Sequence, residues 1–501
     1  MLFRSLKRLL HPSLTLRVRC RPARKAQSHY NESMTFGQLV GFFAALFAFW
    51  TFAIVAVFGV SNLQTRKTVG WFLPLFAIVV MLVFGAHLQP WQRLLASTAA
   101  LLFLLKATIL LQRPQREIIE YSKFGLLLYF TVWPGMNPTP FKARSGVDAT
   151  TMKSSERLFV RGAVVTACGI ALAVLTCVYA PRIDRVLIGW LGIAAFLTTL
   201  HFGFSDVLTF MTRWIGFPIG KLFDAPLRSI SLRDFWSRRW NLAFVEMDKA
   251  LFIKPLHRKF GAVGAIIGVF FISGVLHEMA LSYVANAGWG GPMCYFLLHG
   301  ALVVFESKSK IEKRWPIFLS RVWTWFWLLA PLPILFHAPL RETLLIAPIE
   351  YSNRLITSRP LEWWFSLALW LATIGHFCIL GASFQVPSRL GWREDFAQLS
   401  RFNQKIFWTY GGVIVMLIVS FGLLTGFLHA EMLRGDRAAL GVALLIGTFW
   451  LVRIGVDFFY FKHDDWPQGA MFVVGHVFLT GLFMALTSVY FGLVIWHNFL
   501  R

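Results

Sequence analysis

The chain has 501 residues, of which 57% are hydrophobic and only 15% are charged. A soluble domain carries about 25% charged and about 45–50% apolar residues, so this composition disfavours a soluble protein. The formal net charge is +25, but the basic residues lie mainly in short loops between apolar runs, as the positive-inside bias of membrane proteins predicts. We therefore expect an integral membrane protein with no nucleic-acid partner. Some basic residues are expected to face anionic lipid headgroups or a phosphate-bearing cosubstrate.

Residues 1–35 form a basic segment with eight Lys or Arg and no acidic residue before Glu32. A signal peptide has a short basic start that an apolar core follows at once. Here about 35 residues precede the first long apolar run. We predict an uncleaved cytosolic basic segment.

Long apolar runs follow along the rest of the chain. A helix of roughly 18 or more apolar residues crosses the hydrocarbon core and satisfies its own backbone polar groups. We predict an all-α polytopic membrane protein with about 11 to 13 transmembrane helices. The predicted spans are 37–60, 70–88, 93–112, 160–181, 185–211, 262–286, 290–306, 317–337, 362–382, 406–429, 437–458 and 470–497.

The intervening segments suggest how the chain is organised. The apolar stretch 118–135 is interrupted by Pro134 and Gly135, which predicts a half-helix or an interfacial piece. The stretches 135–160 and 212–260 are polar. A third polar break, 383–405, predicts a boundary between a membrane domain, 36–383, and a C-terminal helical membrane block, 384–501, of unknown role.

One predicted span contains two adjacent ionisable residues, His277 and Glu278, in the run FFISGVLHEMALSYVA. Ionisable groups inside a span are costly in lipid and by default mark function. Neighbouring helical positions point about 100° apart, so one of the two can line a cavity while the other makes a structural bond. The alternative is a hydrogen bond between packed helices with no chemical role.

The 224–241 block, DAPLRSISLRDFWSRRWN, interleaves arginines with aromatic and acidic residues. Ser231, with Asp234 three residues later, predicts a helix start. Asp234 and Arg238, four residues apart, are predicted to pair on one helix face. Arginine and tryptophan together suit a membrane interface, so an amphipathic interfacial helix without a catalytic role is the alternative interpretation.

Together the two segments resemble the membrane-bound O-acyltransferase superfamily, and in particular its wax synthase branch. The resemblance rests on SLRDFWSRRWN and, about 35 residues later, on ISGVLHE, and it covers about 215–305. Ser237 stands where this branch usually has glycine. The resemblance implies a helical core that encloses a chamber or tunnel, with His277 as the catalytic residue and Asn241 as its partner.

This assignment is chemically coherent. A neutral imidazole near its usual pKa takes a proton from an alcohol at cellular pH. Asn241 either donates a hydrogen bond to the thioester carbonyl or oxyanion, or only orients the substrate. Arginine clusters bind phosphates, so the head of acyl-CoA is expected at Arg233, Arg238, Arg239 and Lys221, with Arg228 next. Supporting roles are expected for Asp234, Trp236, Trp240 and Glu278.

Other polar residues in the apolar runs have weaker claims. His201, Ser205 and Asp206 either shape the cavity or pack helices. For His299, Glu306 and His376 we expect structural roles. Arg453 and Asp457 are expected to form an ion pair, with His463, Asp464 and Asp465 in a loop. We predict no metal site and no cofactor, with acyl-CoA as cosubstrate.

We therefore expect an O-acyltransferase that moves a fatty acyl group from acyl-CoA to a membrane-soluble lipid alcohol. One alternative is transfer to a sugar, polymer, sterol or diacylglycerol hydroxyl. Another is a non-enzymatic transporter or lipid scaffold in which His277 and Glu278 form a proton or substrate site. The expected location is the inner or plasma membrane, or the endoplasmic reticulum. The sequence leaves the oligomeric state open.

Overall fold

A computed structural model describes residues 36–310, 314–461 and 470–500, and every regular element in these ranges is a helix. Eleven helices of this part of the chain are long and apolar enough to cross a membrane. The predicted all-α polytopic membrane protein is therefore confirmed. The predicted basic segment, residues 1–35, lies outside the described residues. The chain divides into two compact units, Met1–Asn353 and Arg354–Arg501.

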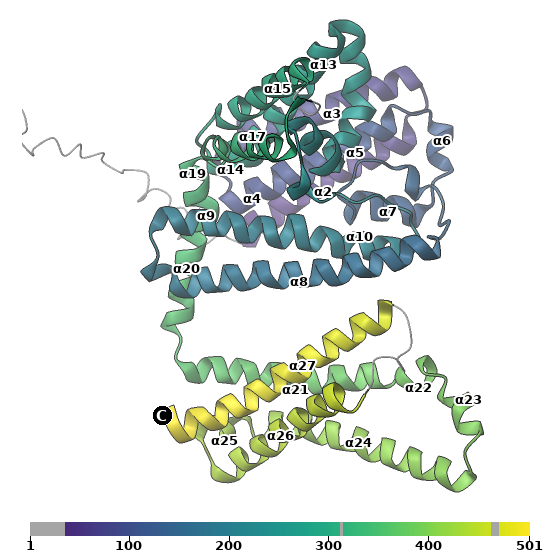
Figure 1. Ribbon diagram of the computed structural model, residues 1–501, viewed down its shortest axis with the longest axis vertical. Coiled ribbons are helices and arrows are strands. Elements are labelled where there is room, and N and C mark those ends of the chain that lie inside the picture. Colours follow the sequence, from purple (N-terminus) through teal and green to yellow (C-terminus); the bar gives the residue numbers. More distant parts are fainter. Residues whose placement is uncertain (1–35, 311–313, 462–469, 501) are drawn as a thin grey trace, which may run out of the picture. The chain divides into compact units, whose positions relative to one another are not determined.

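The first helices of the N-terminal unit form an apolar bundle (Figure 1), in which α2 and α3 both pack on α5. The guanidinium of Arg66, which is fully buried, donates to the carbonyl oxygens of Val57, Val60 and Leu110 at 2.7–3.2 Å. One side chain thus binds carbonyl oxygens at the ends of α2 and α5, where the i to i+4 bonds of a helix run out. The elements are α2 (Phe36–Gly59), α3 (Leu63–Phe84), α4 (Pro90–Leu95), η3 (Ala96–Ala100) and α5 (Leu101–Leu111).

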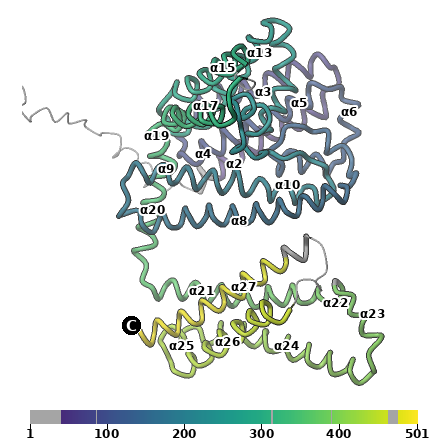
Figure 2. Tube along the Cα trace, viewed as in Figure 1, coloured from purple at the N-terminus to yellow at the C-terminus, as the bar shows by residue number. Residues whose placement is uncertain are grey.

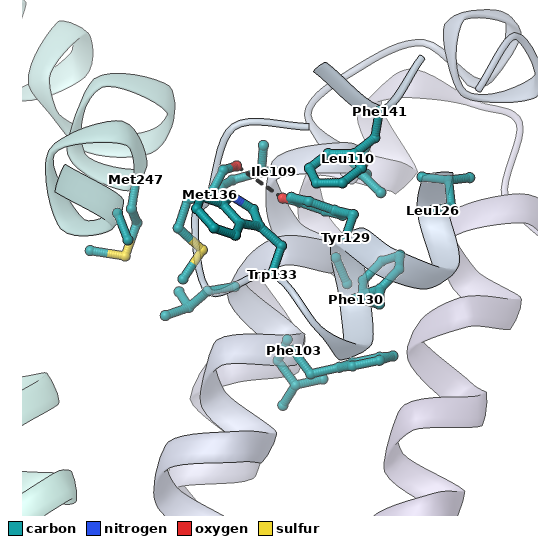
Figure 3. Packing of buried hydrophobic residues seen from close by; sticks show 14 of the residues in the cluster. Phe103, Ile109, Leu110, Leu126, Tyr129, Phe130, Trp133, Met136, Phe141 and Met247 are labelled. Carbon is teal, nitrogen blue, oxygen red and sulfur yellow. Dashed lines mark hydrogen bonds between the residues drawn. The ribbon is translucent and has the colours of Figure 1, made fainter. Parts of the chain in front are cut away.

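A short helix, α7 (Lys123–Thr131), stands in place of a full span, as both predicted alternatives, a half-helix or an interfacial piece, require. Ser122 caps it by accepting a hydrogen bond from the backbone N–H of Gly125, and it ends before Pro134. The hydroxyl of Tyr129 then donates to the carbonyl oxygen of Met136 at 2.9 Å (Figure 3). This bond folds the chain after α7 back onto the helix, inside the largest apolar core.

A buried lysine and a half-buried glutamate hold the same turn. The Nζ of Lys106 on α5 donates to the carbonyl oxygens of Tyr129 and Trp133. The Oε2 of Glu246 accepts from the backbone N–H groups of Met136 and Asn137, at 2.8 and 3.0 Å. The turn after α7 is thereby tied to the helix α12 (Leu242–Met247), which begins directly after Asn241.

Two long helical stretches lie side by side in Figures 1 and 2. One is α8 (Ala149–Tyr179), and the other runs through α9 (Arg185–Phe196), η6 (Leu197–Phe204) and α10 (Ser205–Trp214). The first stretch starts at residue 149 and not at 160 as predicted, because Asp148 caps it by accepting from the backbone N–H of Thr151 at 2.9 Å. The η6 segment is a π-helix, a wide turn that is frequent at functional sites.

The 224–241 block and the helix of His277 lie in the second half of the same unit. Gly261 breaks α13 with a φ of +67°, so its second part starts where the span 262–286 was predicted. α13 packs against α15, the helix predicted at 290–306, which is not among the eleven candidate spans. The elements are α11 (Leu232–Asp234), η8 (Phe235–Arg239), η9 (Asp248–Phe252), α13 (Ile253–His277), η10 (Glu278–Ser282), α14 (Tyr283–Ala285), α15 (Gly291–Ser309), α17 (Ile317–Leu329), α18 (Leu332–Leu335), α19 (Ala338–Arg341), η11 (Glu342–Ile346) and α20 (Ala347–Ser358).

The C-terminal unit has its own apolar core, built around Trp450 and Tyr490. It starts earlier than the boundary expected after residue 383, because α21 packs on α24 and α27. The polar stretch 383–405 instead holds short helices that connect α21 to α24 within this unit. The elements are α21 (Leu361–Ser383), α22 (Val386–Arg389), α23 (Trp392–Ala397), α24 (Arg401–Phe427), α25 (His429–Arg434), α26 (Arg437–Phe459) and α27 (Ala470–Ile495).

Polar groups inside the C-terminal unit are tied to one another. Arg453 Nη1 lies 3.4 Å from Asp457 Oδ1, which confirms that predicted ion pair. Thr480 and His476 lie at the other oxygen of Asp457, at 3.2 and 3.4 Å. The predicted loop residues His463, Asp464 and Asp465 lie outside the described part of the chain.

Candidate active site

His277 ends α13 with a defined ring orientation. Its Nδ1 lies 2.7 Å from the carbonyl oxygen of Ser273, one turn earlier on the helix. A carbonyl oxygen can only accept, so Nδ1 carries the proton and Nε2 keeps its lone pair. Nε2 has no hydrogen-bond partner among the described residues. In the neutral ring, Nε2 is therefore a free base that no described residue uses.

Aromatic rings surround this imidazole. The ring of Phe296 on α15 lies 4.2 Å from it, and that of Phe244 on α12 lies 5.5 Å away, both measured between centroids. His277 nevertheless keeps part of its surface accessible. Phe244 is three residues beyond Asn241, so α12 carries Asn241 at its start and touches His277 one turn later.

The residues around His277 in ISGVLHE have separate structural tasks. Gly274 lets α15 approach, because a Cβ there would lie 2.7 Å from Met293 Sδ and 3.2 Å from Met293 Cα. Glu278 Oε1 accepts from the backbone N–H groups of Gly290 and Met293 at 2.9 and 3.0 Å. Glu278 thus caps the start of α15, where a negative charge is favoured. This geometry supports the structural role proposed for Glu278.

The 224–241 block is fixed by a cap and a buried carboxylate. Ser231 Oγ accepts from the backbone N–H of Asp234 at 2.9 Å, which confirms the predicted helix start. Glu306 on α15 accepts from the backbone N–H groups of Leu232 and Arg233, both at 3.0 Å. Its Oε1 also accepts from Trp323 Nε1. A structural role is the one expected for Glu306, but its partners lie far from it along the chain, so no local sequence pattern indicates them.

The predicted pairing of Asp234 with Arg238 is wrong. Arg239 Nε donates to Asp234 Oδ2 at 2.6 Å, while Arg238 is exposed. The reason is that η8 is a π-helix, in which the backbone bonds run from i to i+5 and the wider turn brings the fifth residue round. Ser237, the departure from the usual glycine, is exposed and donates to the carbonyl oxygen of Arg233 at 2.6 Å, so no close approach is lost.

The two tryptophans of the block both pack on Phe235. Trp236 Nε1 donates to His299 Nδ1 at 3.0 Å, and its ring contacts Phe296, the neighbour of His277. Trp240 stacks on Phe235 with centroids 5.1 Å apart and an interplanar angle of 18°. Both tryptophans thus pack within the block, and Trp236 holds His299.

Asn241 adopts a left-handed backbone conformation, with φ 41° and ψ 63°. Among residues with a side chain, asparagine is one of the few that tolerate this region. Two backbone bonds fix the position: Asp224 N–H to Arg239 O at 2.9 Å, and Leu242 N–H to Leu222 O at 2.8 Å. The side-chain amide of Asn241 makes no hydrogen bond to any described residue.

The four cations expected at the acyl-CoA head fall into two groups. Arg233, Arg238 and Lys221 are exposed, as is Arg228, and the Lys221 ammonium lies 3.9 Å from Asp224. Arg239 is less exposed and is committed to Asp234, with a second contact to the Asp224 carbonyl oxygen at 3.4 Å. Arg239 therefore stabilises the block, and Arg228, Arg233 and Arg238 are the exposed cations without an ion pair to a described residue.

Comparisons with known proteins match the segment of the chain that holds these residues. Residues 219–298 match the model of the membrane bound O-acyl transferase family. Two Arabidopsis thaliana proteins named probable long-chain-alcohol O-fatty-acyltransferase 7 and 2 are 36% and 31% identical over 119 and 154 residues. These matches cover 21% and 28% of this chain, and 35% and 44% of the relatives.

A third relative has a different acceptor in its name. The Arabidopsis thaliana acyl-CoA–sterol O-acyltransferase 1 is 32% identical over 115 residues, or 20% of this chain and 33% of the relative. The chain thus spans less than half the length of these three curated relatives. The segment that holds Asn241 and His277 thus matches the membrane bound O-acyl transferase family, and its resemblance to the wax synthase-like branch is confirmed.

Proposed function

We propose that this integral membrane protein transfers a fatty acyl group from acyl-CoA to the hydroxyl of a lipid alcohol, with a long-chain alcohol as the first candidate acceptor. The observation that carries the proposal is the tautomer of His277. Its Nδ1 proton is tied to the Ser273 carbonyl oxygen at 2.7 Å, which leaves Nε2 as a free base in an aromatic setting.

The proposed step starts with His277 Nε2 taking the hydroxyl proton while the alcohol oxygen attacks the thioester carbonyl carbon. The carbonyl oxygen becomes an oxyanion that the free amide of Asn241 stabilises as a hydrogen-bond donor. Collapse breaks the carbon–sulfur bond, and the imidazolium returns its proton to the leaving thiolate. The products are one ester and free CoA, and His277 is regenerated.

The donor is proposed to bind through its phosphates at Arg233, Arg238 and Lys221, which are exposed. Arginine forks match phosphate geometry and lysine adds a point charge. Arg239 does not serve this role directly, because its Nε is bound to Asp234. It keeps the neighbouring arginines in place. In this proposal, side chains of this chain bind the donor, and acyl-CoA is the cosubstrate.

A sterol is the second candidate acceptor. The supporting observation is the relative whose name specifies acyl-CoA–sterol O-acyltransferase, with 32% identity over 115 residues. Both acceptors present one hydroxyl on an apolar body, so the same base and amide serve either. The acceptor's shape, and not the chemical step, separates the two candidates.

Lipid profiling tests the proposal. Cells that make no wax ester express the intact protein, the His277→Ala variant, or a His87→Ala control, in which an exposed histidine of the same unit is removed. We expect a new ester class with the wild type and the control, and none with His277→Ala. The masses of the new ester distinguish a long-chain alcohol from a sterol. A folded His277→Ala protein that still makes the ester, or a wild type that makes none, would overturn the proposal.

A further inference from the structure

A second imidazole, His201, lies next to the candidate site and has no hydrogen-bond partner among the described residues. It sits on the π-helix η6, and its Nδ1 is buried. Buried polar groups are nearly always hydrogen-bonded, so one without a protein partner calls for an explanation such as a ligand.

The imidazole ring of His201 packs against aromatic rings beside and within the 224–241 block. Its ring lies parallel to that of Trp240, with an interplanar angle of 14° and centroids 6.1 Å apart. The ring of Phe223 meets it edge-on at 5.5 Å. Trp240 directly precedes Asn241, so His201 packs on the residue that positions the free amide.

The two other polar residues weighed in this stretch, Ser205 and Asp206, make hydrogen bonds within the protein. Asp206 accepts from Arg161 Nε at 2.8 Å, and Ser205 donates to the carbonyl oxygen of His201 at 2.5 Å. Of the three residues weighed from the sequence, His201 alone keeps a side chain without such a bond.

Buried histidines with structural roles in this chain look different. His299 Nδ1 accepts from Trp236 Nε1 at 3.0 Å, and His376 Nε2 accepts from Trp450 Nε1 at 3.1 Å. His337 accepts from the backbone N–H of Leu340 through Nδ1. Each uses a ring nitrogen to bind the protein, and His201 does not.

His201 and His277 contact the same short segment of chain: His201 stacks on Trp240, and Phe244, four residues later, packs on His277. On the basis of the proposed function, we propose that His201 binds the hydroxyl of the lipid alcohol and orients it toward His277 Nε2. His201 is thereby a substrate-positioning residue, assigned to the acceptor and not to acyl-CoA.

The chemistry of the ring selects the acceptor. A neutral imidazole has one donor and one acceptor nitrogen, and a hydroxyl likewise both donates and accepts. The thioester carbonyl only accepts, which suits the amide of Asn241. The same helical stretch also exposes apolar side chains, Phe196, Leu200 and Phe204, at 45%, 44% and 46%. An alcohol dissolved in lipid meets this stretch directly.

Three variants of the purified full-length protein test the assignment. His201→Phe keeps a ring to stack on Trp240 and removes both nitrogens, and His201→Gln keeps a hydrogen-bonding group. Glu362→Gln alters an exposed residue of the C-terminal unit and serves as the control. Steady-state ester formation is measured in lipid nanodiscs with labelled acyl-CoA and hexadecanol or a sterol, whichever the wild type esterifies, and each substrate is varied in turn.

We expect His201→Phe to raise the KM for the alcohol about tenfold, the loss typical of one hydrogen bond to substrate, with the KM for acyl-CoA unchanged. His201→Gln should recover part of that loss. Unchanged alcohol kinetics in His201→Phe, or an equal change in both KM values, would overturn the assignment. If His201→Phe does not fold, the two KM values are compared in His201→Gln instead. Kinetics of His201→Gln identical to those of the wild type would then contradict the assignment of His201 to the alcohol. A wild type that forms no ester would instead refute the proposed function.

Discussion

Asp234 and Arg239 form the ion pair that closes the 224–241 block, with Arg239 Nε 2.6 Å from Asp234 Oδ2. The Asp234 side chain is 8% exposed, so the pair is largely withdrawn from water. Arg239 also contacts the carbonyl oxygen of Asp224, and its own carbonyl oxygen accepts from the Asp224 N–H. The pair therefore fixes the segment of chain that ends at Asn241.

This pair gives the first prediction. Arg239→Ala should lower the free energy of unfolding by about 1–3 kcal/mol, because it leaves a buried carboxylate without its charged donor. Arg238→Ala, one residue away and exposed, should change it by less than about 0.5 kcal/mol. Melting temperatures of both variants in detergent measure the difference. Equal destabilisation by the two variants would mean that the ion pair does not hold the block.

Because the backbone of Asn241 is left-handed, a substitution can test the chemical role of its amide apart from its structural role. Asn241→Gly keeps the left-handed conformation, so the variant should fold as the wild type does. Its rate of ester formation should fall about 100-fold or more, the usual loss for an oxyanion donor. Asn241→Ala should lose the same activity and also about 1 kcal/mol of stability, because alanine is strained at this φ. Full activity in Asn241→Gly would refute the proposed role of the amide.

The exposed arginines should affect the binding of the acyl-CoA donor and not the binding of the alcohol acceptor. The double variant Arg233→Gln, Arg238→Gln should raise the KM for acyl-CoA about tenfold and leave the KM for the alcohol unchanged. The wild-type KM for acyl-CoA should rise with salt, because exposed charges are screened. Kinetics at two salt concentrations measure both effects. A double variant with wild-type acyl-CoA kinetics would place the CoA phosphates elsewhere.

The pKa shift of His337 predicts how the free energy of unfolding depends on pH. Burial lowers the pKa of this imidazole, while the charge of Glu278 opposes the shift and that of Arg341 adds to it. Because folding disfavours the protonated ring, the contribution is complete above the unfolded pKa of about 6.5 and is lost as the pH falls below it. Protonation also removes the acceptor that Nδ1 offers to the Leu340 N–H, at 3.2 Å.

The melting temperature should therefore fall between pH 7.5 and pH 5. The fall should be smaller for His337→Asn, since asparagine also caps a helix start and does not titrate. Equal pH dependence in the wild type and this variant would show that another group is responsible.

The sequence predicted the helices well, because apolar length and local caps decide them. The span predicted at 262–286 begins just after Gly261, whose positive φ breaks α13. Ser231 was identified as a cap from spacing alone. The start of α8 was misplaced, since its first turns are polar and held by Asp148.

The site's internal contacts were harder to predict. Asp234 pairs with Arg239 because η8 is a π-helix, and α-helical spacing selects Arg238 instead. The partners of Glu306 and the contact of Phe296 with His277 join residues from different elements. No local pattern encodes such contacts. The C-terminal compact unit starts at Arg354 and not after the polar stretch 383–405, because α21 packs within this unit. Such packing, too, is not visible in the polarity of the sequence.

The most direct test of the central claim is ester formation from labelled acyl-CoA and a lipid alcohol by purified His277→Gln protein in nanodiscs. Glutamine keeps a hydrogen-bonding side chain but supplies no base at neutral pH. We predict a rate about 100-fold or more below the wild type, with an unchanged melting temperature. A folded His277→Gln protein that forms ester at the wild-type rate would contradict the account.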